Sequence, residues 1–112
     1  MRKKRCDRNH LIYKITNKFT GEFYIGITQS IGRAYLASIK KRWKQHISRA
    51  HNQTLDWSLC NSIREYGPDS FKIELVEIIR GKANAHLREV ELIHELKPQL
   101  NVASNKTQYE NN

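Results

Sequence analysis

Apolar side chains alternate with polar or small ones along residues 11–28, and this alternation organises the rest of the chain. Aromatic and β-branched residues at a period of two predict two β-strands. Between them, Asn17 to Gly21 provides turn residues, because Asn bonds its own backbone and Gly adopts positive φ. The stretch is therefore expected to form a β-hairpin.

The position of the turn decides which side chains meet across this hairpin. If the turn is centred between Lys18 and Phe19, Tyr13 and Tyr24 become cross-strand neighbours on one face. Two phenols would then stand side by side, and Gly26 would leave bare backbone next to them.

Over the rest of the chain, the spacing of apolar residues changes from one segment to the next. Apolar residues three and four positions apart predict three helices, and one further alternating run predicts a third strand. The predicted helices are residues 33–50, 57–66 and 83–96, and the predicted strand is 71–79. In the last helix the apolar stripe expected to face the core is Leu87, Val90 and Ile93 or His94, with Leu92 and Leu96 beside it. The order β-β-α-α-β-α predicts an α+β fold with a small, mainly antiparallel three-stranded sheet flanked by helices.

Length and composition indicate one domain with two polar ends. The chain has 112 residues, which is enough for a single core. We expect a basic arm over residues 1–10, a domain over 11–103 and a polar tail over 104–112. The formal net charge of +9 fits a polyanionic partner, most often nucleic acid.

Several classes of protein are not expected from this sequence. No apolar run approaches the ~20 residues of a membrane span. The basic start is not followed by the apolar segment of a signal peptide, so we expect a cytoplasmic protein, in a bacterium or a phage-infected host. The cysteine and histidine spacings lack the pairs of a zinc knuckle.

The first predicted helix carries a dense group of cations. Arg42 and His46 lie four residues apart and therefore share a face. A guanidinium offers forked donors to two phosphate oxygens and keeps its charge. Lys41, Lys44 and Arg49 surround this pair and are candidates for contacting DNA.

Hairpin and helix together resemble the GIY-YIG nucleases. Leu11-Ile12-Tyr13 stands in the place of the GIY triplet, with Leu11 where the family usually has Gly, and Tyr24-Ile25-Gly26 matches YIG outright. The segment RWKQH, residues 42–46, has the spacing of the family's Arg and His on the following helix. The resemblance implies that Arg42 clamps the scissile phosphate.

The same resemblance implies a metal-binding glutamate on the last helix, a dozen or so residues before an Asn. Glu89 fits best, because Asn101 then takes the place of that Asn; Glu91 is the alternative. A single carboxylate suits Mg²⁺ (or Mn²⁺), which keeps several waters and also binds substrate phosphate. Asn101 would brace the site through hydrogen bonds and lie at the DNA.

The expected function is therefore that of a metal-dependent endonuclease that hydrolyses double-stranded DNA. Tyr13 would orient or deprotonate the attacking water, with its pKa lowered by Arg42, Lys41 and the metal. Tyr24 would bond phosphate or water, and His46 would relay the proton.

Two other classes stay open: a non-catalytic nucleic-acid-binding relic of such a domain, and a small interaction protein with a basic surface. Within the nuclease hypothesis, phage, mobile-element and restriction roles all fit. The target sequence, nicking against double-strand cleavage, and the oligomeric state are also open.

Overall fold

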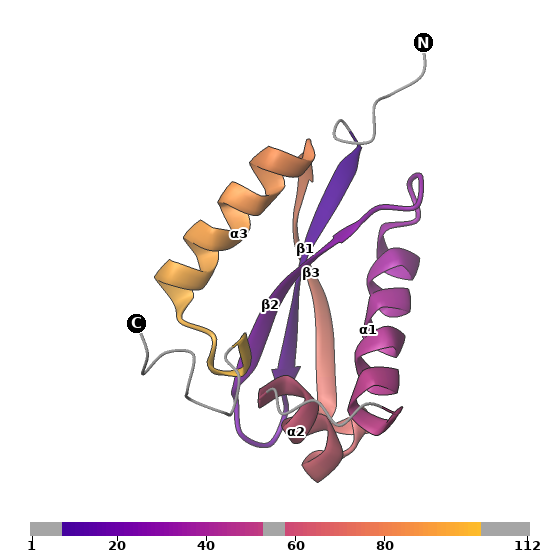
Figure 1. The fold of residues 1–112 in the computed structure, drawn as a ribbon, viewed down its shortest axis with the longest axis vertical. Helices are drawn as coiled ribbons and strands as arrows, with labels where there is room; N and C mark the ends of the chain where they lie inside the picture. Colours follow the sequence, from indigo (N-terminus) through magenta and orange to yellow (C-terminus); the bar gives the residue numbers. More distant parts are fainter. Residues whose placement is uncertain (1–7, 53–57, 102–112) are drawn as a thin grey trace.

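A three-stranded antiparallel sheet forms the middle layer of the computed structural model, which describes residues 8–52 and 58–101 (Figure 1). Its strands are β1 (Asn9–Asn17), β2 (Phe23–Gln29) and β3 (Phe71–Arg80), in the spatial order β2-β1-β3. The central strand β1 is therefore covered on both edges, and its side chains are the most completely buried of the sheet.

Helices cover both faces of the sheet. α1 (Tyr35–Asn52) and α2 (Ser58–Tyr66) lie on one side, and α3 (Lys82–Leu96) lies on the other (Figure 1). Short 3₁₀ turns, Pro68–Ser70 and Gln99–Asn101, precede β3 and follow α3. The order β-β-α-α-β-α and the α+β class predicted from the sequence are confirmed.

The alternation along β1 divides the core into two clusters. Leu11, Tyr13 and Ile15 point toward α1 and α2, and join a cluster that includes Ile39 and Ile63. On the opposite face of the sheet, Ile12 and Ile25 form the second cluster with Leu92 of α3. The period of two in the sequence thus corresponds to two buried faces of one central strand.

The register of the hairpin differs from the expected one by two residues. Tyr13 pairs with Gly26, and Ile15 pairs with Tyr24, so the turn is centred one residue later than predicted. The cause is Asn17, whose side-chain oxygen accepts hydrogen bonds from the backbone N–H groups of residues 19 and 20. Because side chains alternate with a period of two, a shift of two keeps both phenols on one face. They are diagonal neighbours.

The core stripe predicted for α3 is wrong. Leu87 and Val90 are each 62% exposed, whereas Ala85 and Leu92 are buried. On the side of α3 that faces β3, Nε of Arg88 donates a bifurcated hydrogen bond to both carboxylate oxygens of Glu77, at 2.8 and 3.0 Å. On α1 the apolar residue Leu36 is also exposed. Apolar spacing alone does not show which side of a helix meets the sheet.

Element bounds differ from the expected ones by small amounts. β1 begins at Asn9, inside the predicted basic arm, and α1 begins at Tyr35. The described residues do not include 1–7 of that arm, where Cys6 lies, or 53–57, where Trp57 lies. They also do not include the whole predicted tail 104–112. Among the residues that are described, no helix is long and apolar enough to cross a membrane.

Candidate active site

The buried end of the candidate site is a hydrogen bond between Tyr13 and His46. The Tyr13 hydroxyl lies 2.8 Å from Nε2 of His46, although the two residues are 33 positions apart in the chain. Tyr13 projects from the centre of the sheet and is only 1% exposed, and His46 projects from the face of α1 that packs on the sheet. His46 is thus part of the packed face of α1.

Tyr24 and Gly26 complete the sheet side of the site. The Tyr13 and Tyr24 rings have centroids 6.1 Å apart, and Tyr24 meets the His46 ring edge-on at 5.2 Å. A Cβ on Gly26 would lie 2.4 Å from both Cζ and the hydroxyl oxygen of Tyr13, and 2.7 Å from Cε1 of Tyr24. Only glycine leaves room at this position for both phenols.

Arg42 lies one turn before His46 on α1 and is half-buried. Its Nη1 donates to Oε1 of Gln45 at 2.8 Å, but its Nε is buried and has no hydrogen-bond partner in the described part of the chain. The guanidinium is close enough to Tyr13 that its hydrogen bonding and charge act on that phenol. Buried donors are almost always paired in folded proteins, so an unpaired Nε at this position is unusual among the described residues.

The phenols resist ionisation in this environment. Burial raises the pKa of Tyr13, and the neighbouring Tyr24 adds to the rise, while hydrogen bonding and charge from Arg42 only partly oppose it. Burial likewise raises the pKa of Tyr24, against the charge of Arg42. In the protein alone the expected lowering of the Tyr13 pKa is therefore reversed, because loss of solvation outweighs the adjacent cation. Lys41 is exposed and is not among the groups that shift it.

His46 is uncharged at neutral pH. Burial, and then the charges of Arg42 and Arg49, lower its pKa to about 4. One ring nitrogen of a neutral imidazole donates and the other accepts. The bond between Tyr13 and His46 is thus a contact between two neutral groups, and the positive charge of the site comes from the two arginines.

On the opposite side of the sheet, Glu89 of α3 is the acidic group of the site. Its side chain is 18% exposed, and its charge contributes to the raised pKa of Tyr24. Burial raises the pKa of Glu89 itself, opposed by His86. Glu91, the alternative from the sequence, is 56% exposed and its Oε1 lies 3.4 Å from Arg88 Nη1. The geometry thus distinguishes the two glutamates and favours Glu89.

The donor set fits a divalent ion that binds few protein groups. Within residues 8–52 and 58–101, no three side chains of His, Cys, Asp or Glu converge on one point. A hard ion such as Mg²⁺ requires only one or two carboxylates when water and substrate phosphate supply the remaining ligands. The partly buried oxygen ligand of Glu89 matches that chemistry.

Asn101 forms two hydrogen bonds with the backbone of the edge strand β2, which carries Tyr24. Its Oδ1 accepts from the backbone N–H of Ile25 and its Nδ2 donates to the Ile25 carbonyl, both at 2.7 Å. Gln99, which sequence reasoning missed, accepts from the N–H of Phe23 at 3.3 Å. These contacts hold the backbone on which Tyr24 and Gly26 stand, whereas a direct contact of Asn101 with DNA stays a prediction.

The other predicted DNA-binding residues are divided over the surface of α1. Arg49 lies on the same side of the helix as Arg42, and its charge acts on His46 and Tyr24. Lys41 and Lys44 are exposed. At 100° per residue, Lys44 lies about 200° around the axis from Arg42, so the structure does not bring it to the phenols.

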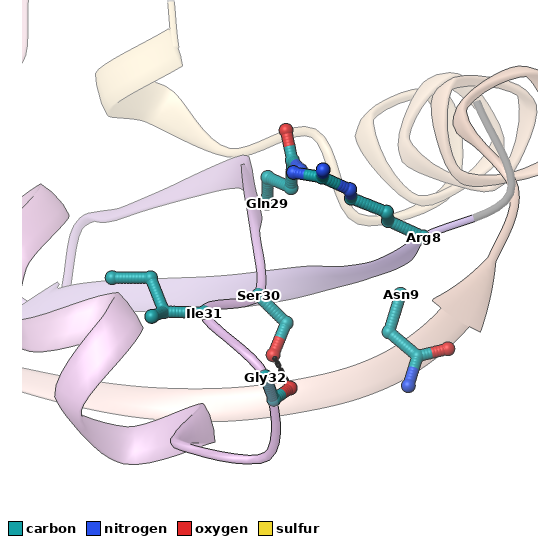
Figure 2. A pocket seen from close by; sticks show the side chains of 6 residues that line it. All are labelled: Arg8, Asn9, Gln29, Ser30, Ile31 and Gly32. Atoms are coloured by element: carbon teal, nitrogen blue, oxygen red, sulfur yellow. Dashed lines mark hydrogen bonds between the residues drawn. The ribbon is translucent and has the colours of Figure 1, made fainter. Parts of the chain in front are cut away.

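A separate hollow of about 510 Å³ lies where β1 begins and β2 ends (Figure 2). Its lining residues are Arg8, Asn9, Gln29, Ser30, Ile31 and Gly32. None of the predicted site residues lines it, and the Ser30 hydroxyl is already used by the Gly32 carbonyl at 2.7 Å. The candidate site is therefore defined by its chemistry and not by the volume of a cavity.

Comparison with known protein families identifies the family of this chain. The family model described as the GIY-YIG catalytic domain matches residues 9–101, from the first residue of β1 to the 3₁₀ turn after α3. No curated protein and no solved structure matches the chain. Because the matched region covers most of the 112 residues, the chain belongs to the GIY-YIG catalytic domain family, which is a family of nucleases.

Proposed function

We propose that this protein is a metal-dependent endonuclease that hydrolyses phosphodiester bonds in double-stranded DNA. The observation that carries the proposal is the buried Nε of Arg42, which has no partner in the described residues and lies beside two phenols. A phosphate oxygen is an acceptor of the right charge and geometry for a guanidinium. The net charge of +9 favours DNA as the source of that phosphate.

Arg42 serves to bind the scissile phosphate and to stabilise the negative charge that develops on its oxygens during hydrolysis. Preorganised donors of this kind are often the largest single contribution to catalysis. Arg49, on the same side of α1, adds a second positive charge within electrostatic range of the phenols. Lys41 and Lys44 would contact the flanking backbone, and Lys44 reaches it only if DNA also passes along the outer side of α1.

Tyr13 and His46 form a short proton relay that never requires a phenolate. The attacking water gives a proton to the Tyr13 oxygen while the Tyr13 proton passes to Nε2 of His46, 2.8 Å away. The hydroxide then forms the new bond to phosphorus, the bond from phosphorus to the 3′ oxygen breaks, and the departing 3′ oxygen takes up a proton from solvent water. The raised pKa of Tyr13 suits this role, because the phenol stays protonated and transmits the proton.

DNA itself would adjust the basicity of the relay. In the protein alone the charge of Arg42 helps to depress the pKa of His46 to about 4. A phosphate bound to Arg42 compensates part of that charge, which raises the pKa of His46 toward the range of a working base. Glu89 would hold the divalent ion, which supplies Lewis-acid polarisation of the phosphate when it is bound.

Plasmid nicking in Mg²⁺ tests the proposal. We expect Arg42→Ala to reduce cleavage by about 100-fold or more, by the loss of one transition-state donor. The matched control is Lys40→Ala, which removes the same charge from an exposed position of α1. Full cleavage by a folded Arg42→Ala variant would refute the assignment. DNA binding without cleavage by the wild-type chain would instead favour the non-catalytic relic.

A further inference from the structure

Beside Glu89, on the preceding turn of α3, lies an imidazole that the proposed mechanism does not use. Nδ1 of His86 is 3.6 Å from Oε1 of Glu89. The His86 side chain is 51% exposed, so it can turn without disturbing the core, whereas Glu89 is mostly covered. Residues three apart lie on the same side of a helix, so both donors are presented together.

The rotation of α3 decides which strand of the sheet this pair lies near. Arg88 is tied to Glu77 on β3, which marks the side of the helix that faces β3. At 100° per residue, Glu89 and His86 lie about 100° and about 160° around the axis from Arg88. They are therefore on the flank nearer to β2, in agreement with the electrostatic effect of Glu89 on Tyr24.

The distance between the two donors is close to that of two ligands on one ion. Neighbouring ligands at roughly 2.1 Å from a divalent first-row metal are roughly 3.0 to 3.4 Å apart in octahedral and tetrahedral geometries. A small rotation of the exposed imidazole closes the difference from 3.6 Å. Glu-x-x-His pairs bind metal in helical bundle proteins; here the order along the helix is reversed, with His86 first, and the spacing of three residues is the same.

We propose that His86 is a second protein ligand of the divalent ion held by Glu89, so that the site prefers imidazole-binding transition ions such as Co²⁺ to Mg²⁺. This inference rests on the proposed function, since it concerns the ion of that same site. Imidazole nitrogen binds the later first-row ions well, whereas Mg²⁺ prefers oxygen. The ligand set would then be one nitrogen, one carboxylate, water and the DNA phosphate.

Metal titration of the full chain without DNA tests the inference. Calorimetric titrations with Co²⁺ and with Mg²⁺ compare wild type with His86→Ala, Glu89→Gln and His94→Ala. His94 is the matched control, because it is an exposed imidazole on the same helix. We expect His86→Ala to weaken Co²⁺ binding by roughly tenfold or more and to affect Mg²⁺ binding much less. Glu89→Gln should weaken both, and His94→Ala neither.

A second readout separates a ligand from an ion-pair partner. Paramagnetic Co²⁺ should shift or broaden the His86 ring signals in the wild type and leave the His94 ring unaffected. Unchanged Co²⁺ affinity in His86→Ala, with no paramagnetic effect at His86, would overturn the ligand role even in a chain that cleaves DNA. Absence of cleavage in every ion would overturn the nuclease proposal, while the titration would still decide the role of His86.

Discussion

Gly26→Ala is predicted to destabilise the protein, although the substitution adds only a methyl group to a strand. The new Cβ would lie 2.4 Å from Tyr13 Cζ and from its hydroxyl oxygen. An ordinary contact begins near 3.4 Å, so the ring must retreat by about 1 Å (3.4 − 2.4). Tyr13 is buried at the centre of the sheet and its hydroxyl is bonded to His46, and therefore it cannot move freely.

Opposing effects set the expected magnitude. Overpacking of a core costs about 1–3 kcal/mol, and weakening the bond between Tyr13 and His46 costs about 1 kcal/mol more. Replacing Gly by Ala also stabilises the fold by about 0.5–1 kcal/mol, because the unfolded chain becomes less flexible. This gain applies here because Gly26 does not have a left-handed φ. The net loss of unfolding free energy is about 2 kcal/mol by these terms.

Urea unfolding followed by tyrosine and tryptophan fluorescence measures this loss. At an m-value of about 1.5 kcal/mol/M for a small domain, the midpoint should fall by about 1 M or more. The matched background is Tyr13→Leu, which removes the ring atoms that meet the Cβ. In that background Gly26→Ala should cost clearly less, since the overlap with Tyr13 is gone and only Cε1 of Tyr24, at 2.7 Å from the new Cβ, still has to move. A gain in stability in the wild-type background, or equal losses in both, would refute the steric argument.

Two further predictions concern the edge strand and the buried histidine. Asn101→Ala should lower stability by about 1–3 kcal/mol, because it leaves both backbone groups of Ile25 without their partner; Gln99→Ala, which loses one longer bond, is the weaker comparison. Equal midpoints for the two variants in urea would contradict the bracing role. For His46, the folded pKa of about 4 lies below the ordinary value of 6.5, so the unfolded chain binds more protons between these values. Stability should therefore fall as pH decreases from about 6.5 to about 4, by about 3 kcal/mol in total, and His46→Gln should flatten this part of the curve. A pH profile unchanged in His46→Gln would show that other groups cause it.

Local pattern was sufficient for the framework of the fold. Alternation identified the hairpin and the third strand, and apolar spacing identified three helices, each within a few residues of its observed bounds. The alternation of side chains also predicted that Tyr13 and Tyr24 share one face. This prediction is correct although the predicted register was wrong by two residues, because a shift of two keeps each side chain on its face. A spacing of four residues was enough to put Arg42 and His46 on one side of a helix.

Tertiary structure decided what the local pattern leaves open. Asn17 set the register through its turn, and the burial of Ala85 and Leu92 set the rotation of α3, which exposed Leu87 and Val90 against expectation. The rotation of α3 depends on packing against strands that are distant in the chain. The Asn17 turn is local, but its position follows from side-chain hydrogen bonds that the apolar pattern does not contain.

The electrostatics of the site were also beyond the sequence. The sequence predicted that cations would lower the pKa of Tyr13. In the protein alone, burial raises that pKa instead. Only packing determines how much water a side chain loses, and loss of water is the largest influence on these groups. The chain alone therefore specified which chemical groups are present and which element carries each of them. Their distances, their solvation and hence their protonation came from the assembled fold.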